Sequence, residues 1–264
     1  MHLGFVGSGE ITAAIVSGLC SGGDASYAIC LSPRNRTISA ELARQFPEVS
    51  VASSNQDVID QCKTVVIAVK PQIVRDVLLG LRFSPRHRVI SVVSSMPVQT
   101  ISELVAPAAR VTRAVPLPSV AHRIGPTALY PDDPVVRNLF AALGTPFATA
   151  SEDQFDAMCA ATATIASYFG YMDGVASWLC RNGISESQAR DYVARMFWGV
   201  TSAAAGAPER SFQSLASKHA TAGGINEVCL RYLAERGILQ GVSDGLDAVK
   251  NRIRETASGY ARAV

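Results

Sequence analysis

The chain begins with a short apolar run that leads directly into a glycine-rich turn. Residues 2–6 predict a buried strand, and Gly7 and Gly9 follow before a helical pattern starts at Ile11. This order is typical of a dinucleotide site, because glycine permits a tight turn and lets the backbone approach a pyrophosphate at the helix N-terminus. Thr12 stands where the usual third glycine would be, so an ordinary strand–turn–helix is the alternative.

Strand and helix patterns alternate through the first half of the chain. Continuous Val/Ile runs such as residues 64–69 suit strands that are covered on both faces. The alternation predicts right-handed βαβ crossovers and a doubly wound parallel sheet in an α/β domain over residues 1–150. The predicted strands are 2–6, 28–32, 64–69, 88–94 and 110–115, with two shorter ones at 127–130 and 146–150.

The pattern changes at Ser151-Glu152-Asp153, which is a helix start signal. Helical spacing then predicts long helices at about 152–182, 185–206 and 238–260. We therefore expect an all-helical second domain over residues 151–264. Its apolar positions suit either packing inside one subunit or an interface with a second copy.

Composition and charge exclude several classes of function. The 264 residues carry a net charge of +2, and the scattered Lys and Arg predict no nucleic-acid partner. No apolar run reaches the roughly 18 residues of a spanning helix, and no secretory signal is evident, so we expect no membrane partner and a cytoplasmic protein. The six cysteines form no C-x-x-C pair, which predicts free thiols and no metal site.

The loop after the second predicted strand bears on the choice of cofactor. An NAD site usually has an acidic residue here, which binds the ribose 2′-OH. This chain has Ser32, Arg34 and Asn35, whose side chains can donate to a 2′-phosphate. The loop therefore favours NADP(H) over NAD(H), and a solvated basic loop is the alternative.

A second candidate cofactor segment is Ala68-Val69-Lys70-Pro71, where the strand predicted at 64–69 ends. Ligands of open parallel sheets bind at the carboxyl ends of strands beside the point where strand order reverses. Pro71 ends the strand and suits the first turn of a helix. Lys70 either faces the cofactor or has a structural role.

Taken in order along the chain, these motifs resemble pyrroline-5-carboxylate reductases. The matching residues are Gly4-Phe5-Val6-Gly7-Ser8-Gly9, Asn55, Ala68-Val69-Lys70-Pro71-Gln72, Val111-x-Arg113-x-Val115-Pro116, Gly125, Gly183-Ile184-Ser185-x-x-x-Ala189 and Gly223-Gly224. The resemblance implies an NAD(P)H-binding Rossmann domain followed by a helical domain that interlocks with a partner subunit, in a homodimer or a multiple of dimers. The cofactor contacts predicted on this basis are Gly7, Ser8, Gly9, Glu10, Ile11, Ser32, Arg34, Asn35, Asn55, Ala68, Val69, Lys70 and Pro71.

Departures from the family pattern fall mainly where the substrate is expected to bind. The family's Met-Pro-Asn-Thr-Pro reads Val115-Pro116-Leu117-Pro118-Ser119 here, and its Ser-Gly-Ser-Gly-Pro-Ala-Tyr reads Ala-Thr-Ala-Thr-Ile-Ala-Ser at 161–167. Its Thr-Ser-Pro-Gly-Gly-Thr-Thr reads Ala-Thr-Ala-Gly-Gly-Ile-Asn at 220–226. Glu10 replaces an Asn beside the pyrophosphate, where a carboxylate repels phosphate unless it turns away. The cofactor half is thus largely kept, and the substrate half is rewritten.

The resemblance predicts an NADPH-dependent reductase of a small cyclic imine with an altered substrate site. Thr221 and Asn226 flank the glycine pair and are the candidate catalytic residues, able to hold a carboxylate or the imine nitrogen. The alternative is helix capping before Glu227, which Asn226 suits. Arg113 follows the family pattern, or it simply pairs with a carboxylate at the sheet edge.

Two other functions remain as alternatives. The first is a non-catalytic dinucleotide-binding protein, which loss of the substrate motifs favours. The second is a hydroxy-acid dehydrogenase, which normally carries a catalytic lysine on the first interdomain helix. No lysine occurs between Lys70 and Lys218, which disfavours this second alternative.

Overall fold

The computed structural model describes residues 1–22 and 27–262. The chain divides into two compact units, Met1–Cys159 with Lys250–Val264, and Ala160–Val249. The expected division at residue 151 stays a prediction, since compactness groups the start of the helical half and the last turns of the chain with the first unit. In the described part of the chain, no helix has both the length and the apolarity needed to cross a membrane.

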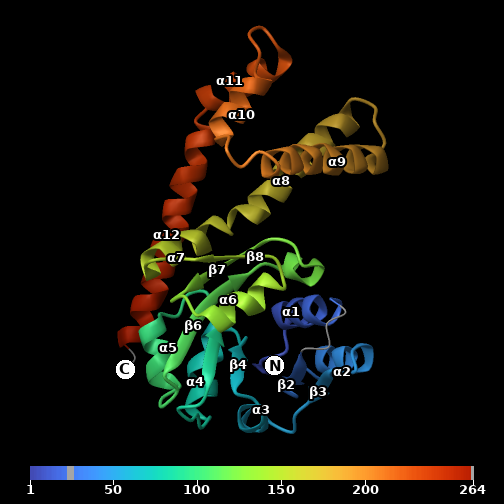
Figure 1. The fold of residues 1–264 in the computed structure, drawn as a ribbon. Coiled ribbons are helices and arrows are strands. Elements are labelled where there is room, and N and C mark those ends of the chain that lie inside the picture. Colours follow the sequence, from blue (N-terminus) through green and yellow to red (C-terminus); the bar gives the residue numbers. More distant parts are fainter. Residues whose placement is uncertain (23–26, 263–264) are drawn as a thin grey trace. The chain divides into compact units, whose positions relative to one another are not determined.

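The first unit is built on one mixed sheet (Figure 1). The strands are β1 (His2–Val6), β2 (Ala28–Leu31), β3 (Val49–Val51), β4 (Thr64–Ile67), β5 (Arg88–Ser91), β6 (Arg110–Pro116), β7 (Pro126–Tyr130) and β8 (Thr145–Ala148). Among the described residues they lie in the order β3-β2-β1-β4-β5-β6-β7-β8. Neighbours pair in parallel except β6 and β7, which are antiparallel. The strand order reverses between β1 and β4, which confirms the predicted doubly wound sheet.

Helices cover both faces of this sheet. They are α1 (Glu10–Cys20), α2 (Arg36–Gln45), α3 (Asn55–Gln61), the 3₁₀ turn η1 (Pro71–Ile73), α4 (Val74–Leu79), α5 (Val98–Leu104), the 3₁₀ turn η2 (Pro118–His122) and α6 (Pro134–Ala141). Alternate residues of one strand enter different clusters: Phe5 packs on one face and Val6 on the other, and both are 0% exposed. Burial on both faces explains why the central strands are almost continuously apolar.

The helical half consists of α7 (Glu152–Ala161), α8 (Thr164–Arg181), α9 (Glu186–Ala205), α10 (Phe212–His219), α11 (Ile225–Glu235) and α12 (Ile238–Arg262). The single helix predicted over 152–182 is wrong, because a turn separates α7 from α8. Thr164 stabilises this turn by donating its hydroxyl to the carbonyl of Ala161 at 2.7 Å. Within the second unit, Phe197 of α9 packs edge-on against Tyr168 and Tyr171 of α8.

Candidate active site

The glycine turn fits a dinucleotide phosphate. Gly9 caps the N-terminus of α1 without any side-chain hydrogen bond, and a Cβ at Gly9 would meet nothing within 4 Å. Gly7 has φ +106°, and a Cβ there would lie 2.4 Å from the carbonyl oxygen of Ala68. The turn is therefore pressed against the end of β4 on one side. On the other side it leaves the first turn of α1 open to an anion.

Thr12, the residue in place of the third glycine, has a structural role in this turn. Its side chain is 0% exposed, and its hydroxyl donates to the carbonyl of Gly7 at 2.8 Å. The hydrogen bond ties the first turn of α1 back to the glycine turn. The sequence signal for this hydrogen bond is a small hydroxyl residue at the position of the usual third glycine. A side chain there can reach the backbone of the preceding turn.

Ser32 lies at the same edge of the sheet, at the end of β2, but its side chain faces the glycine turn. The Gly7 amide donates to Ser32 Oγ at 3.0 Å, and the Ser8 hydroxyl donates to the Ser32 carbonyl at 2.8 Å. Ser32 is 0% exposed. Its hydroxyl thus supports the glycine turn, and the predicted 2′-phosphate site depends on Arg34 and Asn35.

Arg34 and Asn35 are exposed at the start of α2. The Asn35 side chain caps this helix by accepting from the amide of Ile38, at 3.4 Å. The first turn of α2 contains no acidic residue and begins with a second arginine, Arg36. A guanidinium beside a helix N-terminus suits a phosphate group, because both supply positive potential.

The remaining predicted cofactor residues also follow strands at this edge. Ala68 donates its amide to Val6 at 2.8 Å and so continues the β1–β4 pairing, and Val69 is half-buried beyond it. Lys70 is exposed and precedes Pro71, the first residue of η1. Asn55 begins α3 just after β3.

Glu10 and Ile11 begin α1, and Glu10 is exposed. A carboxylate on the surface can turn into solvent, which reduces its repulsion of a phosphate at the helix N-terminus. Because the carboxyl ends of parallel strands meet at one edge, the fold gathers these segments with the glycine turn and Arg34.

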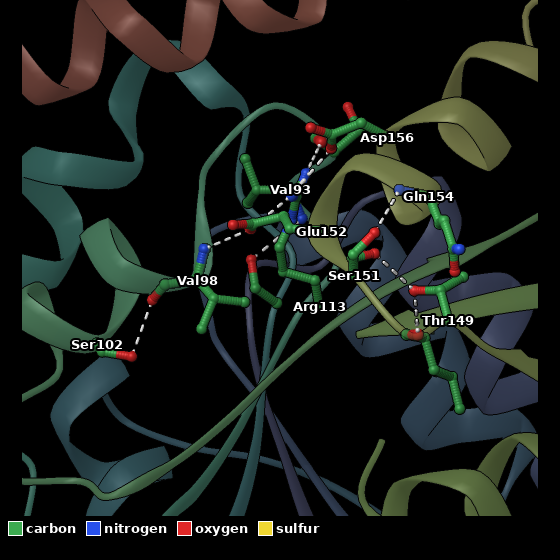
Figure 2. A network of polar contacts seen from close by, with 12 residues as sticks. Val93, Val98, Ser102, Arg113, Thr149, Ser151, Glu152, Gln154 and Asp156 are labelled. Atoms are coloured by element: carbon green, nitrogen blue, oxygen red, sulfur yellow. Dashed lines mark hydrogen bonds and ion pairs between the residues drawn. The ribbon is translucent and has the colours of Figure 1, made fainter. Parts of the chain in front are cut away.

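Arg113 is the largest fully buried side chain of the first unit. The sequence predicts for it either the role of the matching family residue or a pair with a carboxylate. Its guanidinium donates to Glu152 Oε1 at 2.7 Å and to the carbonyl of Ser94, and it stacks 4.4 Å from the ring centre of Phe155. The alternative that Arg113 pairs with a carboxylate is confirmed. Figure 2 shows this guanidinium between Glu152 and Asp156.

Asp156 is the third member of this charge cluster, and its carboxylate is buried without an aligned hydrogen bond. Its Oδ1 lies 3.0 Å from the Arg113 guanidinium, as an ion pair rather than an aligned hydrogen bond. Burial raises the pKa of Asp156 above the ordinary 3.8, and attraction to Arg113 offsets only part of that effect. Sequence reasoning missed both acids, because neither lies near Arg113 in the chain.

The two candidate catalytic residues belong to the second unit. Thr221 and Asn226 are both exposed and flank the turn into α11. The Asn226 amide donates to the carbonyl of His219 at 3.2 Å, while the Gly224 amide donates to the Thr221 carbonyl at 2.8 Å. The capping alternative for Asn226 is wrong: Gly224 is the cap residue, and Asn226 lies one residue into the helix.

Comparison with known proteins assigns each half of the chain to a family model. Residues 2–95 match the model of NADP oxidoreductases that depend on coenzyme F420, and residues 152–256 match the pyrroline-5-carboxylate reductase dimerisation model. Among curated proteins, the pyrroline-5-carboxylate reductase of Vibrio alginolyticus is 23% identical over 96% of each chain. A local match to pyrroline-5-carboxylate reductase 3 of Macaca fascicularis is 32% identical but covers 45% of this chain and 44% of that protein.

Solved structures show the same architecture over nearly the whole length. The 1-pyrroline-5-carboxylate reductase of Streptococcus pyogenes superposes with a TM-score of 0.83 at 25% identity, covering 98% of each chain. The pyrroline carboxylate reductase of Plasmodium falciparum, solved with NADP bound, gives a TM-score of 0.81 at 18% identity, covering 97% of this chain and 98% of that one. These matches confirm the predicted arrangement of a Rossmann-like domain followed by a helical dimerisation domain.

The opposite pKa shifts of Asp156 and its neighbour Asp153 predict opposite effects of acid on stability. The folded-state pKa of Asp156 is raised, so the folded protein gains stability as the pH falls through this raised pKa toward the ordinary 3.8. The Asp156→Asn variant lacks this gain. Hydrogen bonds from Lys250 and Arg254 lower the pKa of Asp153, so its contribution is present above the ordinary 3.8 and is lost below it.

Urea unfolding across the acid range measures both effects, with Asp153→Asn as the matched control. The stability difference between wild type and Asp156→Asn should shift in favour of wild type as the pH falls. The difference for Asp153→Asn should shift the other way at lower pH. A parallel response of the two variants would contradict the burial assigned to Asp156.

Proposed function

Because the chain belongs to the pyrroline-5-carboxylate reductase family, we propose that it is an NADPH-dependent reductase of a small cyclic imine. The observation that carries the proposal is the open N-terminus of α1 behind a glycine turn that is pressed against β4. This arrangement suits the pyrophosphate of a dinucleotide. The cofactor supplies a hydride when it is bound, and the protein supplies position and charge.

We use the name cofactor edge for the sheet edge that carries residues 7–11, 32–35, 55 and 68–71. Each part of this cofactor edge has a distinct proposed role. The backbone of Gly7–Gly9 and the first turn of α1 hold the pyrophosphate, and buried Ser32 keeps that turn in place. Arg34 and the α2 N-terminus that Asn35 caps receive the ribose 2′-phosphate. Residues 68–71 face the nicotinamide side, since β4 lies across the strand-order reversal from β2.

The substrate proposal depends on the segments that differ from the family pattern. Reduction of a C=N bond leaves an amine, so a proton must reach the nitrogen as the hydride reaches the carbon. We assign this proton to the exposed Thr221 hydroxyl or to a water held by Asn226, whose amide nitrogen is already bound to His219. Fewer hydroxyl donors around Gly223-Gly224 favour an imine that is less polar than pyrroline-5-carboxylate.

The second unit is proposed to assemble with a second copy through residues 151–264. Several of its large apolar side chains are exposed in the single chain, including Trp198 at 75%, Phe212 at 81% and Ile225 at 87%. An exposed apolar surface of this kind marks an interaction site. The match of residues 152–256 to a dimerisation model supports a homodimer or a multiple of dimers.

A non-catalytic dinucleotide-binding protein is the second candidate, and the rewritten segment 220–226 is the observation that favours it. The two candidates differ in one measurable property. A reductase oxidises NADPH when a suitable imine is present, whereas a binding protein takes up NADPH and leaves it unchanged. The cofactor edge alone fits both.

A screen of NADPH oxidation against cyclic imines and keto acids tests the proposed reaction. We expect turnover with a cyclic imine other than pyrroline-5-carboxylate, because loss of even one hydrogen bond to a charged carboxylate weakens binding about ten- to a hundredfold. A kcat/KM for pyrroline-5-carboxylate above about 10⁴ M⁻¹s⁻¹ would refute the altered substrate site. NADPH binding without oxidation of any tested imine would favour the non-catalytic candidate.

Cofactor preference is expected to depend on Arg34. NADPH should bind more tightly than NADH, and Arg34→Asp should weaken NADPH binding by about tenfold or more, since it replaces a phosphate partner with a like charge. Cofactor fluorescence measures both affinities. Arg44→Asp is the matched control, because Arg44 is exposed at the opposite end of the same helix. Equal binding of NADH and NADPH to wild type would exclude a 2′-phosphate site here.

Assembly is expected to depend on the exposed aromatic residues of the second unit. Trp198→Glu should convert the dimer to a species near the 27.9 kDa of one chain, because it would bury an unpaired carboxylate in the interface. Light scattering at low micromolar concentration gives the mass. Leu79→Glu, at a 63% exposed position of α4, is the control and should keep the wild-type mass. A monomeric wild type would contradict the proposed interface.

A further inference from the structure

The loop between β5 and α5 is held at two points by one cluster of charged side chains. In the middle of the loop, the carbonyl of Ser94 accepts from the Arg113 guanidinium. At its end, the Val98 amide donates to Glu152 Oε1 at 2.8 Å. That carboxylate oxygen also accepts from Arg113 at 2.7 Å, so it joins the two contacts, as Figure 2 shows.

The helix that carries Glu152 is in turn attached to the end of α12. Asp153 pairs with Lys250 at 2.9 Å and with Arg254 at 2.6 Å. Two turns further along α12, the Tyr260 hydroxyl donates to the carbonyl of Pro71 at 2.8 Å. α12 therefore also contacts a second loop, the one that leaves β4.

These two loops occupy neighbouring positions at one edge of the sheet. β4 and β5 pair in parallel, so their carboxyl ends lie side by side. β4 and β5 lie on one side of β1, and β2 lies on the other side. In a doubly wound fold, the loop after β2 binds the adenosine ribose. From this topology we expect the loops at 94–98 and 68–71 to lie beside the nicotinamide half of a bound dinucleotide.

We propose that Glu152 and Tyr260 are positioning residues that fix these two loops for the nicotinamide half of the cofactor. The inference rests on the proposed NADPH site. Neither side chain needs to touch the cofactor, because each acts through a backbone group of its loop. The contact through Glu152 is supported by Arg113, because this guanidinium is 1% exposed and a buried charge requires a paired partner.

The Glu152 contact is tested by comparing three variants. Glu152→Ala removes the acceptor of the Val98 amide, and we expect NADPH to bind about tenfold more weakly, the usual effect of a lost charged hydrogen bond. Glu152→Gln keeps an amide oxygen for Val98 and should recover most of that loss. Asp156→Asn is the matched control: Asp156 also pairs with Arg113 but has no hydrogen bond to the loop, so NADPH affinity should stay within about twofold.

Binding of 2′,5′-ADP separates positioning from general destabilisation. This probe carries only the adenosine half of NADPH, so Glu152→Ala should leave its affinity unchanged while NADPH binding weakens. Hydrogen exchange at the Val98 amide should accelerate in the same variant. Equal losses for both ligands, or unchanged NADPH affinity, would overturn the inference. If Glu152→Ala does not fold, the Glu152→Gln pattern and the Tyr260 variant decide the question.

Tyr260→Phe tests the second contact with little change in packing. The ring remains against the core, and only the hydroxyl bonded to the Pro71 carbonyl is lost. We expect NADPH affinity to fall about threefold to tenfold, with 2′,5′-ADP affinity and the melting temperature near wild type. Unchanged NADPH affinity would overturn the role of Tyr260. A wild type that binds NADPH but reduces no imine contradicts the proposed function alone, since binding decides the positioning roles.

Discussion

The close approach between the glycine turn and the end of β4 sets the geometry of the cofactor edge. A side chain at Gly7 would lie 2.4 Å from the Ala68 carbonyl, so only glycine lets these two backbones meet. Ser32 then closes the turn from the other side through its hydroxyl and carbonyl. Three neighbouring strands, β2, β1 and β4, are thereby joined at their carboxyl ends. The open N-terminus of α1 is the surface that this arrangement leaves for an anion.

A buried charge organises the adjoining part of the same edge. Arg113 lies on β6 with almost no exposure, and a guanidinium in that position must be paired. Two acids of α7 and the carbonyl of Ser94 provide the pairing. The first helix of the helical half is consequently tied to the sheet, and the β5–α5 loop is held between them. Two acids facing one base leave one charge poorly compensated, and the raised pKa of Asp156 reflects this burial.

The cofactor edge and segment 220–226 differ in how closely they match the pattern of pyrroline-5-carboxylate reductases. The cofactor edge has the glycine turn, the strand order and a basic loop at the start of α2, which suit the proposed dinucleotide site. The segment at 220–226 keeps Gly223-Gly224 but presents Ile225 and Asn226 where the family pattern has hydroxyl residues. In the proposed reductase, such a change would alter which ligand is recognised more than whether hydride chemistry is available, because the cofactor carries that chemistry.

The sequence by itself determined the doubly wound sheet, the helical half and the glycine turn, because these follow from local patterns. Buried parallel strands are continuously apolar, and a tight turn between strand and helix requires glycine. Sequence reasoning failed where a short element has little pattern of its own, as with β3 and the break between α7 and α8. The sequence also predicts Ser32 as a cofactor contact, and it gives no sign of the bonds that Ser32 makes to the glycine turn. Only the tertiary structure decided that this hydroxyl binds Gly7 and that Arg113 meets Glu152 and Asp156, since those contacts join residues about 25 to 43 positions apart and depend on how the strands and helices pack.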